Sequence, residues 1–344
     1  MASRQTVFVT GATGYIAKHV VLKLLDAGYR VVGSVRSPDR AAEVRDAVLP
    51  HLDAPDEIGQ RLRFATLDLT SDDGWDEALA GSDALIHTAS PFPMAQPDDP
   101  DQLIRPAVDG ALRALRAAKA AGVGRVVMTS SSVAIVNTAL PVRRESYTED
   151  DWTDLDDPGA SAYAKSKTMA ERAAWAFVRD EAPELALTVI NPVFVLGPPL
   201  DRAYGTSVKV IERILRAKDP MVPRIGFSTV DVRDVAEMHV RALTTPNSVG
   251  QRLIACDRFL WLEDMAEILK AAHPDRKIVT RRAPNMAVRI LALFDPAIRG
   301  IVPDLGKRKA VSNARAQTVM GMAFRDAAET VRETGAWLIG NRIV

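Results

Sequence analysis

The chain has 344 residues, and its 44 basic and 44 acidic residues give a formal net charge of zero. Hydrophobic residues make up 47% of it, enough for a sizeable core, and the length fits one large α/β unit with a smaller lobe. The charge balance argues against a nucleic-acid partner, and no apolar run reaches the roughly 18 residues that a membrane span needs. No signal-peptide pattern opens the chain, so we expect a cytoplasmic protein without a membrane partner. The single cysteine, Cys256, is expected to be a buried core residue.

The first 195 residues alternate short β-branched runs with longer helical patterns. Strands are predicted at 6–10, 30–35, 62–66, 84–87, 125–130 and 187–191, and helices include 17–27 and 108–121. The strands are almost continuously apolar, as expected where both faces of a parallel sheet are covered. Right-handed crossovers then predict an α/β fold with a Rossmann-type, doubly wound parallel sheet.

The pattern changes after residue 196, where prolines cluster at 198, 199, 220 and 223. A strand-like run at 229–232, a helix at 234–242 and a strand near 251–255 are expected to return to the main sheet. We therefore predict a main domain of residues 1–195 with 228–257, and a smaller, mostly helical lobe of 196–227 and 258–344. The apolar stretch 286–294 is interpreted as a helix of this lobe rather than a membrane anchor. The acidic stretch 145–157 is interpreted as a solvated loop, and no metal site is expected.

Residues 7–17 end the first strand in a glycine turn and open a helix, the context in which a glycine motif indicates a dinucleotide site. Gly11 permits a tight turn, and Gly14 lets the backbone approach a pyrophosphate. The free amide groups at the start of the helix would face that anion. The expected contacts are Gly11, Thr13, Gly14, Tyr15 and Ile16.

The residue after the second strand usually meets the adenosine ribose, and an acid there is typical of NAD sites. Here that strand ends in Arg36, with Arg40 four residues later. Because a guanidinium can bind a 2′-phosphate with two hydrogen bonds, the pair favours NADPH/NADP+. Asp68 is expected to accept a hydrogen bond from the adenine amine. Other expected contacts after the third and fourth strands are Leu69, Thr88, Ala89 and Ser90.

Tyr163 and Lys167 are four residues apart in a predicted helix, so they share one face. A nearby ammonium favours the phenolate of a tyrosine and suits it to exchange a proton with a carbonyl oxygen. The fifth strand ends in a serine run, where a hydroxyl could orient that oxygen. This combination behind a glycine motif predicts hydride transfer with Tyr163 and Lys167 as the catalytic pair.

These residues resemble the extended short-chain dehydrogenase/reductase superfamily. Within it the chain is similar to the branch of dihydroflavonol reductases, cinnamoyl-CoA reductases and yeast-type aldehyde and methylglyoxal reductases. The resemblance is carried by Val35-Arg36-Ser37-Pro38, His87-Thr88-Ala89-Ser90-Pro91-Phe92, Ser166-Lys167-Thr168 with Ala170-Glu171, Asn191-Pro192-Val193-Phe194 and Asp231-Val232-Arg233-Asp234. It extends from residue 10 to about 240 and is looser beyond 257.

The resemblance implies that Ser131 orients the carbonyl oxygen and that Lys167 also holds the nicotinamide ribose. It places Pro192 and Val195 at the nicotinamide and Ser207 near the pyrophosphate. The flavonoid reductases carry an asparagine five positions after the serine, whereas this chain has Val136 there. This difference favours a reductase of aldehydes, ketones or keto esters over one of flavonoids.

Two alternatives remain open at this stage. A nucleotide-sugar epimerase or dehydratase of the same superfamily would need an arginine-rich diphosphate pocket, for which Arg281 and Arg282 are available. The apolar Phe92, Met94 and Phe194 suit a smaller carbonyl substrate better. A non-catalytic NADP-sensing regulator would not need the tyrosine–lysine pair. The resemblance leaves both a monomer and a homodimer open.

Overall fold

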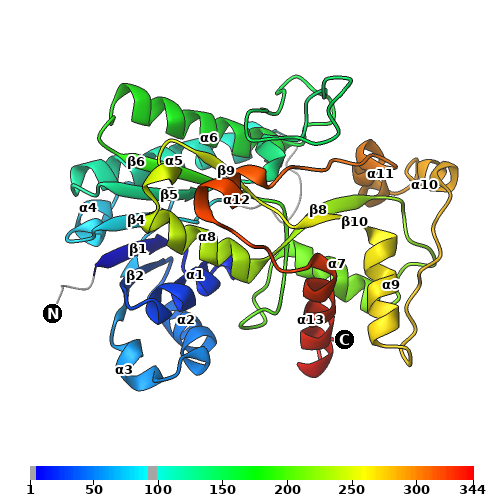
Figure 1. Ribbon diagram of the computed structural model, residues 1–344, viewed down its shortest axis with the longest axis horizontal. Helices are drawn as coiled ribbons and strands as arrows, with labels where there is room; N and C mark the ends of the chain where they lie inside the picture. The colour runs from blue at the N-terminus through cyan, green and yellow to red at the C-terminus, as the bar shows by residue number, and fades with distance from the viewer. Residues whose placement is uncertain (1–4, 92–98) are drawn as a thin grey trace.

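The computed structural model describes residues 5–91 and 99–344, and within these ranges its largest element is a seven-stranded parallel sheet (Figure 1). The strand order is β3-β2-β1-β4-β5-β6-β9. The bounds are β1 Thr6–Thr10, β2 Arg30–Val35, β3 Leu62–Thr66, β4 Ala84–His87, β5 Arg125–Thr129, β6 Ala186–Pro192 and β9 Arg252–Ala255. The six strands predicted before residue 195 are all present, with ends that differ by one residue at most. This sheet confirms the predicted Rossmann-type fold.

Helices cover both faces of the main sheet. One face packs against α1 (Tyr15–Asp26), α2 (Arg40–Val48), α8 (Val232–Thr244) and α12 (Ala314–Met320). The other packs against α4 (Trp75–Leu79), α5 (Asp101–Ala120) and α6 (Ala162–Asp180). The short α3 (Pro55–Gly59) follows α2. Each helix buries one apolar stripe; in α5 this stripe includes Ala107, Ala111, Ala114 and Leu115.

The smaller lobe contains a second sheet, which in the described residues has three strands in the order β10-β8-β7. The strands are β7 (Phe194–Leu196), β8 (Gly226–Asp231) and β10 (Arg258–Trp261). The helices that accompany them are α7 Thr206–Leu215, α9 Leu262–Ala272, α10 Asn285–Leu291, α11 Pro296–Ile301 and α13 Ala327–Gly340. Buried residues of α7, α9 and α13 form a core of their own with the small sheet.

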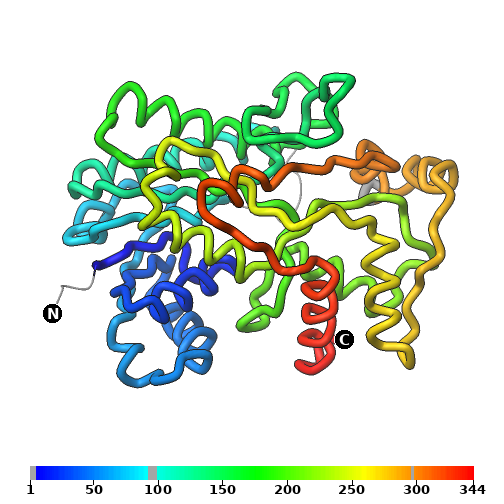
Figure 2. The backbone as a smooth tube through the Cα atoms, viewed as in Figure 1, coloured from blue at the N-terminus to red at the C-terminus, as the bar shows by residue number. Residues whose placement is uncertain are grey.

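The segment 228–257 differs from expectation at its start. Helix α8 packs on the main sheet and β9 is one of its edge strands, but β8 does not join it. Strand β8 pairs in parallel with β7 and antiparallel with β10, so both of its edges are occupied within the small sheet. Figure 2 shows the chain crossing back from α11 to the main sheet at α12 and returning to the lobe at α13.

Cys256 is 1% exposed, which confirms the prediction of a buried residue, and burial raises the pKa of its thiol to about 12. The stretch 145–157 forms no helix or strand. Across residues 5–91 and 99–344, no group of three or more His, Cys, Asp or Glu side chains is arranged to hold a metal ion. None of the helices in those ranges combines the length and the apolar character needed to cross a membrane.

Candidate active site

A cavity of about 260 Å³ lies at the carboxyl ends of β1, β2 and β4, where the glycine turn leads into α1. Gly11 has a φ of +65°, and a Cβ there would lie 3.0 Å from the Cβ of Ala89. A Cβ on Gly14 would lie 3.3 Å from the carbonyl oxygen of Gly11. Larger residues would therefore strain the turn and narrow the space above it. This is the cradle that a pyrophosphate needs at a helix N-terminus.

The cavity is lined by most of the predicted cofactor residues from the first four strands. They are Gly11, Thr13, Gly14, Arg36, Arg40, Leu69, Thr88, Ala89 and Ser90. Sequence reasoning missed Thr10, Ser34, Val35, Leu67 and Trp75, which also line it. Thr10 Oγ1 accepts hydrogen bonds from the backbone N–H groups of Thr88 and Ala89, both at 3.0 Å. Ser34 Oγ accepts one from the N–H of Gly11 at 2.8 Å. Both are small polar residues at or next to the end of a strand, and that position is the sequence signal that could have identified them.

The two arginines of the cavity differ in their surroundings. Arg40 donates from Nε and Nη2 to Glu43 Oε2, at 3.0 and 2.8 Å. Glu43 is also paired with the buried Lys18 at 2.7 Å. Hydrogen bonds from Thr70 are the main cause that lowers the pKa of the Asp68 carboxyl, and the nearby charge of Arg36 adds a smaller effect. The Arg36 side chain itself is exposed. Arg36 is thus the freer of the two to meet a phosphate.

Other predicted cofactor residues do not line this cavity. Asp68 is exposed, and its Oδ1 accepts hydrogen bonds from the N–H and hydroxyl of Thr70. Tyr15 donates its hydroxyl to the carbonyl of Gly197 at 2.8 Å, and Ser207 donates to the carbonyl of Val195. Ile16 follows Tyr15 in α1, and Pro192 ends β6. These residues lie around the turns that border the site, so their contacts with a cofactor remain predictions.

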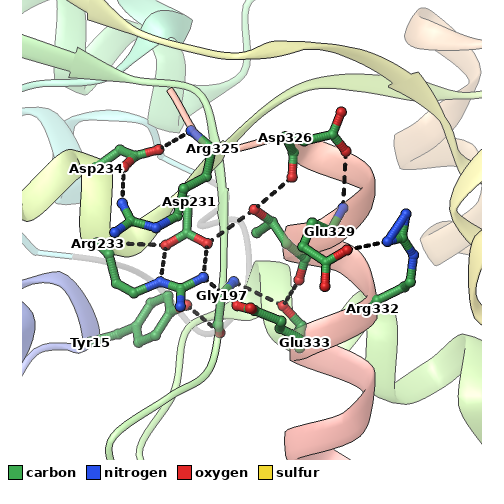
Figure 3. A network of polar contacts seen from close by, with 12 residues as sticks. Tyr15, Gly197, Asp231, Arg233, Asp234, Arg325, Asp326, Glu329, Arg332 and Glu333 are labelled. Carbon is green, nitrogen blue, oxygen red and sulfur yellow. Dashed lines mark hydrogen bonds and ion pairs between the residues drawn. The ribbon is translucent and has the colours of Figure 1, made fainter. Parts of the chain in front are cut away.

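A polar network fixes the turn at Gly197, beside Tyr15 (Figure 3). The N–H of Gly197 donates to Thr334 Oγ1 on α13 at 2.8 Å. Thr330, one turn earlier on α13, donates to Asp231 Oδ2 at 3.0 Å, and Asp231 also accepts from Arg233. The C-terminal helix therefore supports the end of β7, which carries Val195.

The predicted catalytic residues meet where β5 ends and α6 begins. Ser161 caps α6 by accepting from the N–H of Ala164 at 3.1 Å, which places Tyr163 in the first turn. The hydroxyls of Tyr163 and Ser131 are hydrogen-bonded to each other. Lys167 Nζ lies 5.9 Å from the centre of the Tyr163 ring. The structure brings all three predicted residues together.

Burial sets the protonation of this group. It raises the pKa of Tyr163 to about 12, against a smaller lowering by the hydrogen bond with Ser131, so the phenol is protonated at neutral pH. Burial lowers the pKa of Lys167 to about 8, while the charge of Glu171 opposes that shift. Lys167 is therefore mostly an ammonium at pH 7. The arrangement can donate a proton and a hydrogen bond to one carbonyl oxygen.

Two neighbours of the site bear on the sequence interpretation. Burial, followed by the charge of Lys167, lowers the pKa of His87 to about 3. His87 is thus a neutral, packed strand residue bonded to Thr10 Oγ1 at 2.9 Å. On the lobe side, Phe194 stacks on Phe227 with ring centres 4.3 Å apart. Phe92 and Met94, the other apolar residues noted in the sequence, lie outside the described residues.

Comparison with known proteins gives the family. The model of the NAD dependent epimerase/dehydratase family matches residues 7–255. The chain belongs to this family of extended short-chain dehydrogenases/reductases. It is 29% identical to NADPH-dependent methylglyoxal reductase GRE2 of Saccharomyces cerevisiae, over 97% of this chain and 98% of that protein. It is 36% identical to cinnamoyl-CoA reductase 1 of Arabidopsis thaliana, over 80% of this chain and 77% of that protein.

Solved structures of the family agree with this assignment. The crystal structure of yeast methylglyoxal/isovaleraldehyde reductase Gre2 complexed with NADPH has a TM-score of 0.80 and 27% identity. That match covers 99% of this chain and 100% of the other. The similarity therefore includes the smaller lobe, where the sequence resemblance alone was looser.

Proposed function

We propose that this protein is an NADPH-dependent carbonyl reductase that converts aldehydes, ketones or keto esters to alcohols. The observation that carries the proposal is that Tyr163, Ser131 and Lys167 meet at the end of β5, two strands along the sheet from the glycine turn after β1. The relatives named above are reductases, which favours this function over sugar-nucleotide epimerisation. The tyrosine–lysine pair disfavours a purely sensing role.

The cavity lining and the family resemblance together support the assignment of the cofactor contacts. Gly11, Thr13, Gly14, Tyr15 and Ile16 would hold the pyrophosphate, with Ser207 nearby. Arg36 would bind the 2′-phosphate, and Arg40 would join it by leaving Glu43. The remaining assigned contacts are Asp68, Leu69, Thr88, Ala89, Ser90, Tyr163, Lys167, Pro192 and Val195. On this proposal the main sheet and its flanking helices bind the cofactor, and the smaller lobe, including β8, binds the substrate.

The residues then divide the reaction as follows. Bound NADPH supplies the hydride to the carbonyl carbon. Ser131 donates a hydrogen bond that orients the carbonyl oxygen, and Tyr163 gives that oxygen its proton. The Lys167 ammonium stabilises the resulting phenolate, which regains a proton from solvent. Phe194 and Phe227 would provide an apolar wall for a small carbonyl compound.

We infer that the enzyme works in the cytoplasm on a small-molecule carbonyl substrate, without nucleic acid or membrane as partner, as a monomer or a homodimer.

The test is NADPH oxidation with a panel of aldehydes, diketones and keto esters, with NADH in parallel. Tyr163→Phe keeps the ring but removes the proton donor, so we expect kcat to fall at least about 100-fold. Tyr29→Phe, in the turn between α1 and β2, is the matched control and is expected to keep full activity. Reductase activity that survives Tyr163→Phe would refute the catalytic assignment.

A further inference from the structure

One turn after Lys167, helix α6 carries a carboxylate that the proposed chemistry does not use. The side chain of Glu171 is fully buried. Its Oε2 accepts hydrogen bonds from Ser130 Oγ at 2.6 Å and from Asn191 Nδ2 at 2.8 Å. Its Oε1 forms an ion pair with Arg252. A charge withdrawn from water in this way is costly unless it is fully compensated.

We propose that Glu171 is a positioning residue for carbonyl reduction: its carboxylate holds the ends of β5 and β6 against α6 and faces Lys167 with a negative charge. This inference rests on the proposed function, because it assigns Glu171 a part in the same reaction. Arg252 balances the negative charge of the Glu171 carboxylate, and Asn191 bridges Glu171 to the backbone of Ser131.

The geometry links Glu171 to the residue that orients the substrate. Ser130 immediately precedes Ser131, so the bond from Ser130 ties the end of β5 to α6. Asn191 Nδ2 lies 3.3 Å from the carbonyl oxygen of Ser131 as well as contacting Glu171. Glu171 and Tyr163 both lie on α6, so the Glu171 carboxylate sets the position of the Ser131 backbone relative to Tyr163. A displacement of about 1 Å in a catalytic group can lower the reaction rate by a large factor, so the relative position of Ser131 and Tyr163 matters for catalysis.

Arg252 lets the carboxylate remain charged. Its Nη1 donates to the backbone carbonyls of Glu149 and Asp151, both at 2.7 Å. Its guanidinium lies 3.6 Å from the centre of the Trp152 ring. The arginine is therefore held in place by the loop that precedes α6, and its charge is directed at Glu171.

The charges around Lys167 give Glu171 a second effect. Tyr163 and Glu171 flank Lys167 on α6, and His87 faces it from β4. His87 is neutral, and Arg252 on β9 lies behind the carboxylate. Burial lowers the pKa of Lys167 to about 8, and Glu171 is the charge that raises it. Without Glu171, Lys167 would lose its proton at lower pH.

The test compares the pH dependence of kcat/KM for NADPH-driven reduction in Glu171→Gln and the native enzyme. For the native enzyme we expect kcat/KM to fall as pH rises through about 8, where Lys167 deprotonates. In Glu171→Gln this fall should move down by about one pH unit. We also expect kcat at pH 7 to drop roughly tenfold, with a smaller change in the KM for NADPH. Glu171→Asp keeps the charge and should retain the native pH profile.

The matched control is Glu149→Gln. Glu149 is also buried, at 3% exposed, and its Oε1 accepts from the N–H of Ile254 rather than facing Lys167. This variant should lower the thermal unfolding midpoint without moving the pH profile. If Glu171→Gln folds poorly because Arg252 is left unpaired, the double variant Glu171→Gln, Arg252→Gln removes both charges. It should still show the displaced profile.

The outcomes separate the two proposals. If the native enzyme reduces carbonyls, Tyr163→Phe does not, and Glu171→Gln keeps the native kcat and pH profile, the positioning role alone is overturned. The same holds if Glu149→Gln moves the profile equally, since the effect would then be a general loss of packing. If the native enzyme has no reductase activity, both proposals fail.

Discussion

Arg36 and Arg40 are four positions apart in sequence, but their surroundings give them different freedom to bind a phosphate. Two N–H groups of Arg40 already donate hydrogen bonds to Glu43, which also forms an ion pair with Lys18. Arg36 is exposed at the end of β2, and both side chains line the cavity. Two residues that look equivalent in the motif are thus distinguished by a single neighbouring carboxylate.

We predict that Arg36→Ala raises the KM for NADPH by about 10- to 100-fold, because a hydrogen bond to a charged group contributes roughly 1.5–3 kcal/mol. The KM for NADH and the kcat at saturating NADPH should change little, since NADH has no 2′-phosphate. Arg30→Ala, at the exposed start of the same strand, is the control. Equal increases in the KM for both cofactors would contradict the assignment.

At the scale of elements, helix α13 connects the chain's C-terminal end to the turn after β7. Thr334 Oγ1 accepts from the N–H of Gly197 and donates to the carbonyl of Thr330 at 2.7 Å. Gly197 has a φ of +122°, and a Cβ there would lie 3.0 Å from Val232 Cγ1. The glycine is therefore required by its backbone conformation and by its close neighbours, and α13 satisfies its N–H (Figure 3).

Replacing Thr334 by Val should lower the free energy of unfolding by about 1–3 kcal/mol, because the buried N–H of Gly197 loses its acceptor. Chemical denaturation measures this change. Thr318→Val on α12 is the control: Thr318 also donates to the carbonyl four residues earlier, but it is exposed. A loss of the same size in Thr318→Val would show that the bond to Gly197 is not the cause.

For the molecule as a whole, the sequence predicted what depends on neighbouring residues. The six strands, the glycine turn and the Tyr163–Lys167 pair all rest on short spacings. The Glu171–Arg252 ion pair joins residues 81 positions apart, and the Gly197–Thr334 bond spans 137. Only the fold brings such residues together. Strand β8 was placed in the wrong sheet for the same reason, because its pattern does not reveal which edges it meets.

Buried histidines make the stability of the whole molecule depend on pH. Burial is the largest cause that lowers the pKa of His19 and His239 to about 4 and that of His87 to about 3. Below about pH 6.5 these histidines take up protons in the unfolded chain, whereas in the folded chain they stay neutral until the pH approaches 4. The free energy of unfolding is therefore highest above pH 6.5 and decreases as the pH falls. At pH 5 each of these histidines should lower the free energy of unfolding by roughly 2 kcal/mol relative to neutral pH.

We therefore expect the thermal unfolding midpoint to fall between pH 7 and pH 5, and His239→Gln to reduce this fall. At neutral pH that variant should be less stable, because His239 bonds Thr129 Oγ1 and the carbonyl of Val235, both at 2.7 Å. His51 is exposed, so His51→Gln should change the pH dependence much less than His239→Gln does. An equal fall in midpoint for the native protein and His239→Gln would mean that His239 is not neutral when folded. Because His87 ends β4 and His239 bonds Thr129 at the end of β5, acid would loosen the sheet edge that carries the proposed active site.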